Sequence, residues 1–189
     1  MQLLTDMISR RLGNSLIATA DDPGLESWLA FMGSCATLSR HHSTRALINL
    51  DIGGGTTNPA QGLNGQVFDC GCFYIGARHL TFVPGTYTLL SFSSFGSLLL
   101  QYLGCEKQPG DTLNTDEVDA VVNFYVTALE FIALGDMSFF QRSPLHKSLL
   151  QMPFTPAANA GTHPLITFSG GVGEIIYQHE RTGEWPAQT

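Results

Sequence analysis

Two short stretches of this chain each join a buried strand to a run of glycines, and they constrain its fold more than any other feature. Residues 46–52 (A-L-I-N-L-D-I) read as a buried strand, and Gly53-Gly54-Gly55 follows at once. Residues 165–168 read as a second buried strand, after which 169–173 (S-G-G-V-G) lead into a short helix at about 174–177. We therefore expect an α/β fold with helices packed on a mixed sheet.

The segment after the first glycine run predicts a meander of antiparallel strands. One strand should begin near Thr56, although Pro59 weakens it because proline cannot donate to a β-ladder. Residues 62–65 predict a turn, 66–74 a returning strand and 79–83 another short strand. Strands at this spacing, joined by tight turns, favour an antiparallel arrangement.

Helices are expected on both sides of this meander. Asp22-Pro23 is a typical helix start, and the helix should run through Met32. A longer helix should be capped by Thr115 and end before Gly135. Its predicted apolar face consists of Val118, Val121, Val122, Tyr125, Ala128, Leu129 and Ile132. Further helices are predicted at 1–12, 96–103 and partly at 145–152, and a strand at 15–20. We expect a single domain over 1–178 and a polar tail over 179–189.

Composition excludes several classes of function. The chain has 189 residues, 43% apolar and 13% charged, which is typical of a globular protein. Its net charge of −7 disfavours general nucleic-acid binding, which requires a basic surface. No apolar run is long enough to span a membrane. We expect neither nucleic acid nor membrane as a partner, and the oligomeric state stays open.

The four cysteines do not form a recognisable disulfide or zinc pattern. Cys70 and Cys72 are spaced C-x-C, and no second pair completes a metal site. Cys35 and Cys105 stand alone. We expect four reduced, mostly buried thiols in a cytoplasmic protein.

The first glycine run carries the strongest functional signal. A strand ending in Asp51 enters a turn formed by Gly53, Gly54 and Gly55, where bare main-chain N–H groups can approach a phosphate. Thr56 and Thr57 add hydroxyl donors. Asp51 is placed to meet Mg²⁺ through water, since that ion keeps much of its hydration shell. The alternative is an ordinary hairpin with a glycine-rich turn.

The second glycine run offers a surface for a nucleoside. Gly170 and Gly171 can lie against a planar ring, and Glu174 in the first helical turn can accept from sugar hydroxyls. The alternative is an ordinary strand-to-helix corner in which the helix dipole favours Glu174.

Other residues give weaker signals. His41-His42 is better explained as a solvated turn than as a metal site, because adjacent helical residues point apart. Trp28, Phe31 and Met32 are expected in the core, with partner docking open if they are exposed. Arg78 can meet a phosphate or a surface carboxylate. No catalytic residue is assigned.

Together the two glycine runs resemble the ATP-binding superfamily of actin, heat-shock chaperone ATPases and sugar kinases. D-I-G-G-G-T-T-N at 51–58 is similar to its second phosphate loop, and S-G-G-V-G-E at 169–174 to its adenosine loop. Segments 20–27, 48–58 and 65–78 further resemble the ethanolamine ammonia-lyase reactivating factors, the EutA family. This likeness covers roughly residues 12 to 178 and implies a ribonuclease-H-like, actin-like ATPase lobe.

The resemblance implies a chaperone-like, ATP-dependent reactivating factor that helps exchange damaged cobalamin on ethanolamine ammonia-lyase. It implies ATP and Mg²⁺ as cofactors and ethanolamine ammonia-lyase as partner. It also implies a cytoplasmic location associated with a bacterial microcompartment. In physical terms, the state of the nucleotide would bias the angle between two lobes and hence the affinity for the lyase.

The chain departs from the family pattern in three respects. It has no upstream D-x-G-T-T-type phosphate loop and no region beyond the S-G-G-V segment, so we expect it to correspond to a middle domain. Pro59 interrupts the predicted strand, and Ala77 stands where the family has glycine. Half a nucleotide site should bind ATP weakly and hydrolyse it little.

Two other functions remain open. The chain can be a non-catalytic docking module that keeps the actin-like fold. It can also be a small-molecule kinase of the same superfamily, which would need an acceptor pocket and a general base.

Overall fold

The computed structural model describes residues 22–157 and 163–185. The helix expected at 1–12 and the strand expected at 15–20 lie outside these ranges. Within them, the structure holds eight strands in two sheets and six α-helices. None of the helices in the described ranges has the length and apolarity needed to cross a bilayer.

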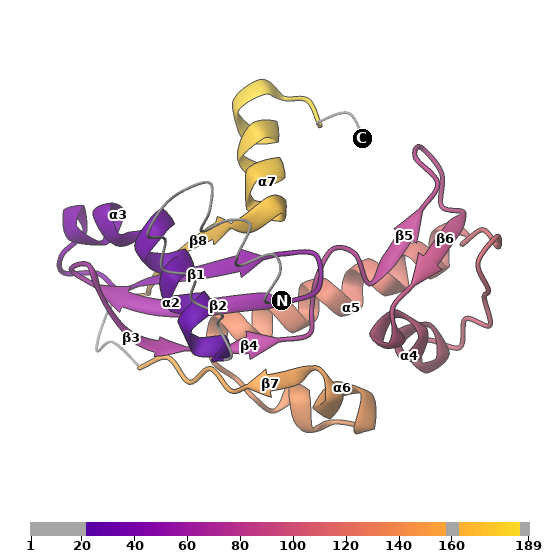
Figure 1. Ribbon diagram of the computed structural model, residues 1–189, viewed down its shortest axis with the longest axis horizontal. Coiled ribbons are helices and arrows are strands. Elements are labelled where there is room, and N and C mark those ends of the chain that lie inside the picture. The colour runs from indigo at the N-terminus through magenta and orange to yellow at the C-terminus, as the bar shows by residue number, and fades with distance from the viewer. Residues whose placement is uncertain (1–21, 158–162, 186–189) are drawn as a thin grey trace, which may run out of the picture.

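The larger sheet is mixed, and β1 lies between β2 and β8 (Figure 1). The strand order is β7-β4-β2-β1-β8, with β3 also paired to β2. β1 runs antiparallel to β2 and parallel to β8. The strands are β1 (Leu47–Ile52), β2 (Thr57–Leu63), β3 (Gln66–Cys70), β4 (Cys72–Phe73), β7 (Leu150–Met152) and β8 (Leu165–Ser169). An antiparallel meander with a parallel strand beside its first member is the arrangement expected of a ribonuclease-H-like lobe, and the α/β class with a mixed sheet is confirmed.

Pro59 lies inside β2 and does not end it. Its carbonyl accepts a hydrogen bond from the amide of Gly71 over 2.9 Å, at the break between β3 and β4. In an antiparallel ladder the nitrogen and the oxygen of one residue face the same neighbour. The missing N–H of Pro59 therefore falls where the neighbouring strand is already interrupted. This break also divides the single returning strand predicted at 66–74.

Helices cover both faces of the sheet, because the side chains of β1 alternate between two cores. Ile48, Leu50 and Ile52 enter the larger core with Phe124 and Ile132. The latter two belong to α5 (Thr115–Leu134), which lies behind the strands in Figure 1. On the opposite face, Leu47 packs with Phe31 and Cys35. That face is covered by α2 (Pro23–Ser34) and α3 (Ala36–His41).

Asp22 caps α2 as predicted, with its carboxylate accepting from the Gly24 amide over 2.8 Å. The long helix α5 departs from the prediction in two details. Its N-cap is Asn114, in a capping box with Glu117, and Thr115 is the first helical residue. Val122 is 51% exposed, whereas Phe124 takes a place in the core. Gly135 ends α5 in the left-handed conformation, as expected.

A second, two-stranded sheet stands apart from the first at one end of the molecule (Figure 1). It pairs β5 (Leu80–Phe82) with β6 (Leu89–Phe92), and α4 (Ser94–Tyr102) follows directly. The prediction that the strand at 79–83 continues the meander was therefore wrong, since that strand pairs forward with a strand that the sequence had not indicated. We call β5, β6 and α4 the small subdomain. Leu80, Leu89 and Leu99 join the larger core, which unites both parts.

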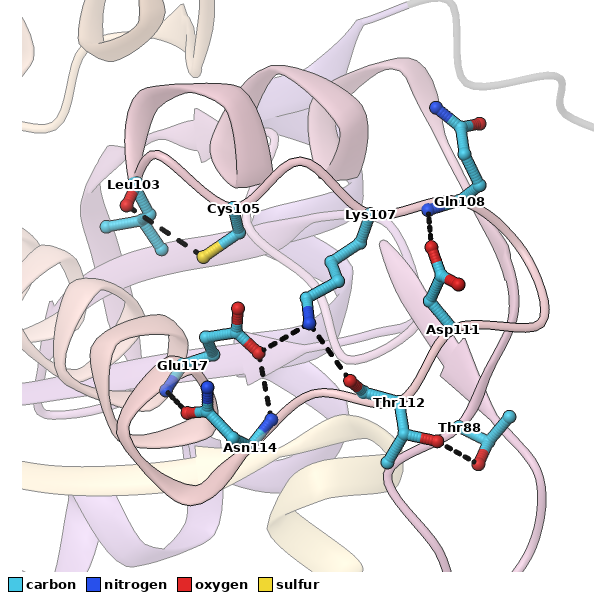
Figure 2. Close-up of polar contacts among 9 residues, drawn as sticks. All are labelled: Thr88, Leu103, Cys105, Lys107, Gln108, Asp111, Thr112, Asn114 and Glu117. Carbon is cyan, nitrogen blue, oxygen red and sulfur yellow. Dashed lines mark hydrogen bonds and ion pairs between the residues drawn. The ribbon is translucent and has the colours of Figure 1, made fainter.

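The loop between α4 and α5 is held by polar contacts around Lys107 (Figure 2). The Lys107 ammonium lies 3.0 Å from a carboxylate oxygen of Glu117 and donates to the Thr112 carbonyl over 3.1 Å. Glu117 also accepts from the Asn114 amide over 2.8 Å. These contacts tie the loop after α4 to the N-terminus of α5.

The C-terminal part contains more regular structure than expected. A 3₁₀ turn (Phe139–Gln141) and α6 (Pro144–Ser148) precede β7, so the helix predicted at 145–152 ends early and gives way to a strand. The final helix α7 (Gly170–Thr182) is longer than the predicted 174–177 and runs into the stretch expected to be a tail. His179 in this helix stacks on Trp185 at 3.8 Å between ring centroids.

Candidate functional site

Asp51 is the penultimate residue of β1 and Ser169 the last residue of the parallel strand β8, so both lie at the same edge of the larger sheet. They are directly paired in register, and the Ser169 hydroxyl donates to Asp51 Oδ1 over 2.7 Å. The carboxyl ends of parallel strands are where ligands bind in open α/β sheets. The topology thus brings the two glycine runs together.

A network of hydrogen-bonded polar side chains centred on Asn49 holds this edge of the sheet in place. Asn49 is fully buried, and its amide nitrogen donates to the Ser169 hydroxyl over 2.8 Å. The side-chain oxygen Oδ1 of Asn49 accepts from the Thr167 hydroxyl over 3.1 Å and from the Cys35 thiol over 3.3 Å. Such a satisfied network fixes side-chain positions. Sequence reasoning missed Asn49 and Ser169. The signal was available, because every second residue of two paired parallel strands faces the same side.

The triglycine turn closes the hairpin between β1 and β2 and is braced by the segment after β4. The Gly53 amide donates to the Thr56 carbonyl over 2.9 Å. The carbonyls of Gly53 and Gly54 accept from the amides of Ala77 and Arg78 over 3.0 and 2.7 Å. A Cβ on Gly76 would come within 2.5 Å of the Gly54 carbonyl and the Gly55 nitrogen. The exposed Ala77 is accommodated in this bracing segment.

The residues of the triglycine turn and the two threonines after it differ in exposure. Gly53, Gly54 and Thr56 are half-buried and Gly55 is exposed. Thr57 is buried, and its hydroxyl donates to the Ile75 carbonyl over 2.7 Å. The structure therefore does not place Thr57 among surface donors for a phosphate, and its hydroxyl instead holds β2 to the segment that follows β4.

The second glycine run packs against the end of β1. Gly170 has a φ of +73°, and a Cβ there would lie 2.6 Å from the Ile52 carbonyl oxygen and 2.9 Å from Asp51 Oδ1. Gly171 is exposed, and a Cβ there would meet nothing within 4 Å. Gly170 thus serves the contact between the two runs, and Gly171 leaves an open surface.

Two cavities flank the start of α7. One, of about 280 Å³, is mostly apolar and lies beside the triglycine turn, with Ile52, Gly76, Tyr125 and Val172 among its lining. The other, of about 460 Å³, includes Gly170, Glu174 and Arg181. Glu174 and Val172 thus line different cavities. The structure does not bring Glu174 to the hollow nearest the triglycine turn.

Other sequence candidates take structural or surface roles. His41 and His42 are exposed, in agreement with a solvated turn. Phe31 is buried, whereas Trp28 is 42% exposed. All four cysteines are free thiols, and three of them are buried. In the part of the chain that the structure describes, no cluster of three His, Cys, Asp or Glu residues is arranged to hold a metal ion.

Comparison with known proteins identifies the family of this chain. The family model described as ethanolamine utilisation protein EutA matches residues 2–186. Ethanolamine ammonia-lyase reactivase EutA of Escherichia coli strain K12 is 31% identical over 174 residues, 92% of this chain and 35% of that protein. The reactivase of Salmonella typhimurium strain LT2 is 31% identical over 168 residues, 88% of this chain and 34% of that protein.

The chain spans about a third of the length of these curated relatives. Among solved structures, MreB 5 of Spiroplasma citri bound to AMPPNP aligns over 96% of this chain and 57% of that one. The sequence identity is 12% and the TM-score 0.39. The match over nearly the whole chain decides the family: this chain belongs to the ethanolamine utilisation protein EutA family.

Proposed function

We propose that the chain is a nucleotide-binding part of a chaperone-like, ATP-dependent factor that reactivates ethanolamine ammonia-lyase by helping to exchange damaged cobalamin. Membership of the EutA family supports the proposal, as do the names of its relatives, which are ethanolamine ammonia-lyase reactivases. The partner is then the lyase, and the place of action the cytoplasm, in association with a microcompartment.

The observation that carries the nucleotide site is the pattern of glycines that the fold itself does not require. A glycine is structurally required where φ is positive or where a Cβ would collide. Among the described glycines, Gly33, Gly53, Gly55 and Gly171 have neither a positive φ nor a Cβ contact closer than 3.4 Å. Three of these four lie in the two runs that meet at Asp51. The space beside them is what a phosphate needs to reach the main chain.

The residues present fit Mg²⁺-ATP at this edge. Asp51 is half-buried and oriented by Ser169, so its carboxylate is held where water ligands of Mg²⁺ can be bound. The triglycine turn offers main chain to the phosphates, and the apolar cavity beside it suits a base better than the cavity of Glu174. When bound, Mg²⁺ neutralises phosphate charge. The chain's own residues bind the nucleotide and orient its phosphates.

Titration calorimetry with Mg²⁺-ATP tests the proposal. Gly55→Ala should fold like the wild type, because its Cβ meets nothing, yet weaken binding at least tenfold by blocking the main chain. Gly33→Ala is the matched control. Its Cβ also meets nothing, and at this exposed position of helix α2 alanine should stabilise the fold by up to about 1 kcal/mol.

The control variant should leave nucleotide binding unchanged. The same pair should be measured in a full-length relative, since half a site is expected to bind weakly. Equal affinities of Gly55→Ala and Gly33→Ala would refute the site.

A docking module that keeps the fold is the second candidate, favoured by one surface. Trp28 and Phe68, 42% and 50% exposed, line a groove between α2, β3 and the end of β7. Absence of ATP binding in the full-length relative, together with retained lyase binding, would favour this function. The small-molecule kinase alternative gains no acceptor pocket or general base from the described residues.

A further inference from the structure

His79 lies between the triglycine turn and the small subdomain and belongs to neither. It is 5% exposed and follows directly on Gly76, Ala77 and Arg78, the segment that braces the turn. The main-chain amides of Ala77 and Arg78 both donate hydrogen bonds to carbonyls of the turn. Any displacement of the turn is therefore passed to the main chain one residue before His79.

On its other side, His79 is fastened to the start of α4. Its Nδ1 lies 2.8 Å from the hydroxyl oxygen of Ser93, which is the N-cap of that helix. The Ser93 amide donates to the His79 carbonyl over 2.9 Å. A Cβ on Gly96 would stand 2.2 Å from that same carbonyl oxygen, so α4 packs directly on the His79 main chain. The Phe95 ring meets the imidazole edge-on at 5.5 Å.

These contacts indicate which ring nitrogen carries the proton. The Ser93 hydroxyl oxygen accepts from the Gly96 amide over 3.1 Å, so its own hydrogen is available to Nδ1. Burial lowers the pKa of His79, while the main chain of Gly55 and of Tyr74 acts in the opposite direction. Burial therefore favours the neutral ring, and the Ser93 hydroxyl as donor to Nδ1 favours the tautomer with its proton on Nε2. That nitrogen is buried and has no hydrogen-bond partner of good geometry.

We propose that His79 is a positioning residue whose Nε2–H completes a hydrogen bond to the Gly55 carbonyl when the triglycine turn closes on a phosphate, and which passes that closure through Ser93 to α4. The inference rests on the proposed nucleotide site and deepens it by naming how the site is coupled to the small subdomain.

The physical basis is a difference between two states. A ligand shifts a conformational equilibrium only by its differential interaction with the states. A buried donor without a partner is unfavourable, and the main chain of Gly55 and of Tyr74 lies close enough to the imidazole to raise its pKa. Closure of the turn that satisfies Nε2 is therefore favoured together with phosphate binding, and α4 shifts with it because it packs on His79.

Two substitutions separate the two ring nitrogens. In His79→Gln the side-chain amide reaches the position of Nε2 and keeps a donor there. In His79→Asn the shorter amide reaches only the position of Nδ1, so it can contact Ser93 but leaves no donor toward Gly55. His146→Asn is the matched control, since His146 is also buried and contacts a serine, Ser143, over 2.7 Å. Unfolding midpoints check that each variant folds.

Hydrogen exchange with and without Mg²⁺-ATP measures the coupling. In the wild type, His79→Gln and His146→Asn, nucleotide should slow amide exchange both in 53–56 and in 89–102. In His79→Asn, affinity should fall about tenfold, as expected for one hydrogen bond, and slowing should be confined to 53–56. If ATP binds and still slows amide exchange in 89–102 of the His79→Asn variant as much as in the wild type, the inference fails and the proposed function survives.

Ligand-free measurements keep the inference testable if no nucleotide binds. In that case the proposed function fails, and two results decide the role of His79. Nitrogen chemical shifts of the imidazole must show the proton on Nε2. Exchange in both 53–56 and 89–102 must be faster in His79→Asn than in His79→Gln. A proton on Nδ1, or equal exchange in the two variants, overturns the inference.

Discussion

The Ser169 hydroxyl and the Asp51 carboxylate, 118 residues apart in sequence, are joined by a hydrogen bond of 2.7 Å across two parallel strands. The same hydroxyl accepts from the buried amide of Asn49 over 2.8 Å. One side chain therefore orients the proposed magnesium-binding carboxylate and satisfies a buried donor at the same time.

Replacement of Ser169 by Ala should affect both roles. The Asn49 amide would lose its acceptor, and a buried unsatisfied donor costs about 1–3 kcal/mol. Asp51 would lose its orienting donor, so Mg²⁺-ATP binding should weaken. Ser169→Thr retains the hydroxyl and should behave close to wild type. Urea unfolding and calorimetry provide the two readouts. A variant Ser169→Ala as stable and as tight-binding as Ser169→Thr would contradict the assignment.

The two adjacent glycines 170 and 171 should respond differently to alanine. Gly170→Ala places a Cβ 2.6 Å from the Ile52 carbonyl oxygen at a φ of +73°, so we expect the free energy of unfolding to fall by about 1–3 kcal/mol. Gly171→Ala meets nothing within 4 Å and should change stability by less than about 0.5 kcal/mol. Chemical denaturation of both variants is the measurement. Similar losses in the two would show that the runs do not meet as described.

Acidification should destabilise the fold through two buried histidines. Burial lowers the pKa of His79 and of His146 from 6.5, and the positive charge of Arg142 adds to the effect at His146. Both rings therefore bind protons at a lower pH in the folded chain than in the unfolded chain, which takes up protons below about pH 6.5. The stabilisation is therefore complete above that pH and is lost as the pH falls from there through the folded values.

The measurement is the urea midpoint between about pH 7.5 and 5.5, a range that lies above the carboxylate titrations. The loss of stability over this range should be smaller in a His79→Gln, His146→Gln double variant. His42→Gln, at an exposed position, should keep the wild-type loss. An identical loss in the double variant would mean that other groups titrate.

Cys70 should be a slow nucleophile despite its partial exposure. Burial, followed by the negative charges of Asp69 and Asp22, raises the pKa of its thiol from 9.0 to about 11. Near pH 8 the thiolate fraction is then lower by about a hundredfold, and alkylation by iodoacetamide should slow accordingly. Asp22→Asn removes one charge while asparagine still caps α2, so it should speed labelling. Peptide mass spectrometry follows the rate, and labelling of native Cys70 at the rate of a free thiol would refute the prediction.

The sequence by itself determined the local structure and the motifs at the site. The runs predicted as buried strands at 46–52 and 165–168 became β1 and β8. β1 is largely buried as predicted, but β8 is the edge strand of the sheet and its Ile166 is 41% exposed, so the expected burial of the second strand was wrong. Asp22-Pro23 became a helix start, because a capping carboxylate and a fixed φ act within one turn of chain. The EutA resemblance followed from motifs of this kind, since main-chain chemistry leaves a local pattern in the sequence.

Tertiary structure alone decided how these parts meet. Pro59 is tolerated in β2 only because the neighbouring strand breaks at Gly71, a match between distant segments. Thr57 turns inward to Ile75, Glu174 opens on a different cavity from Val172, and His79 joins the turn to α4. Strand pairing and side-chain packing set these relationships through contacts that are distant in sequence, and no local periodicity encodes which distant group a side chain will meet.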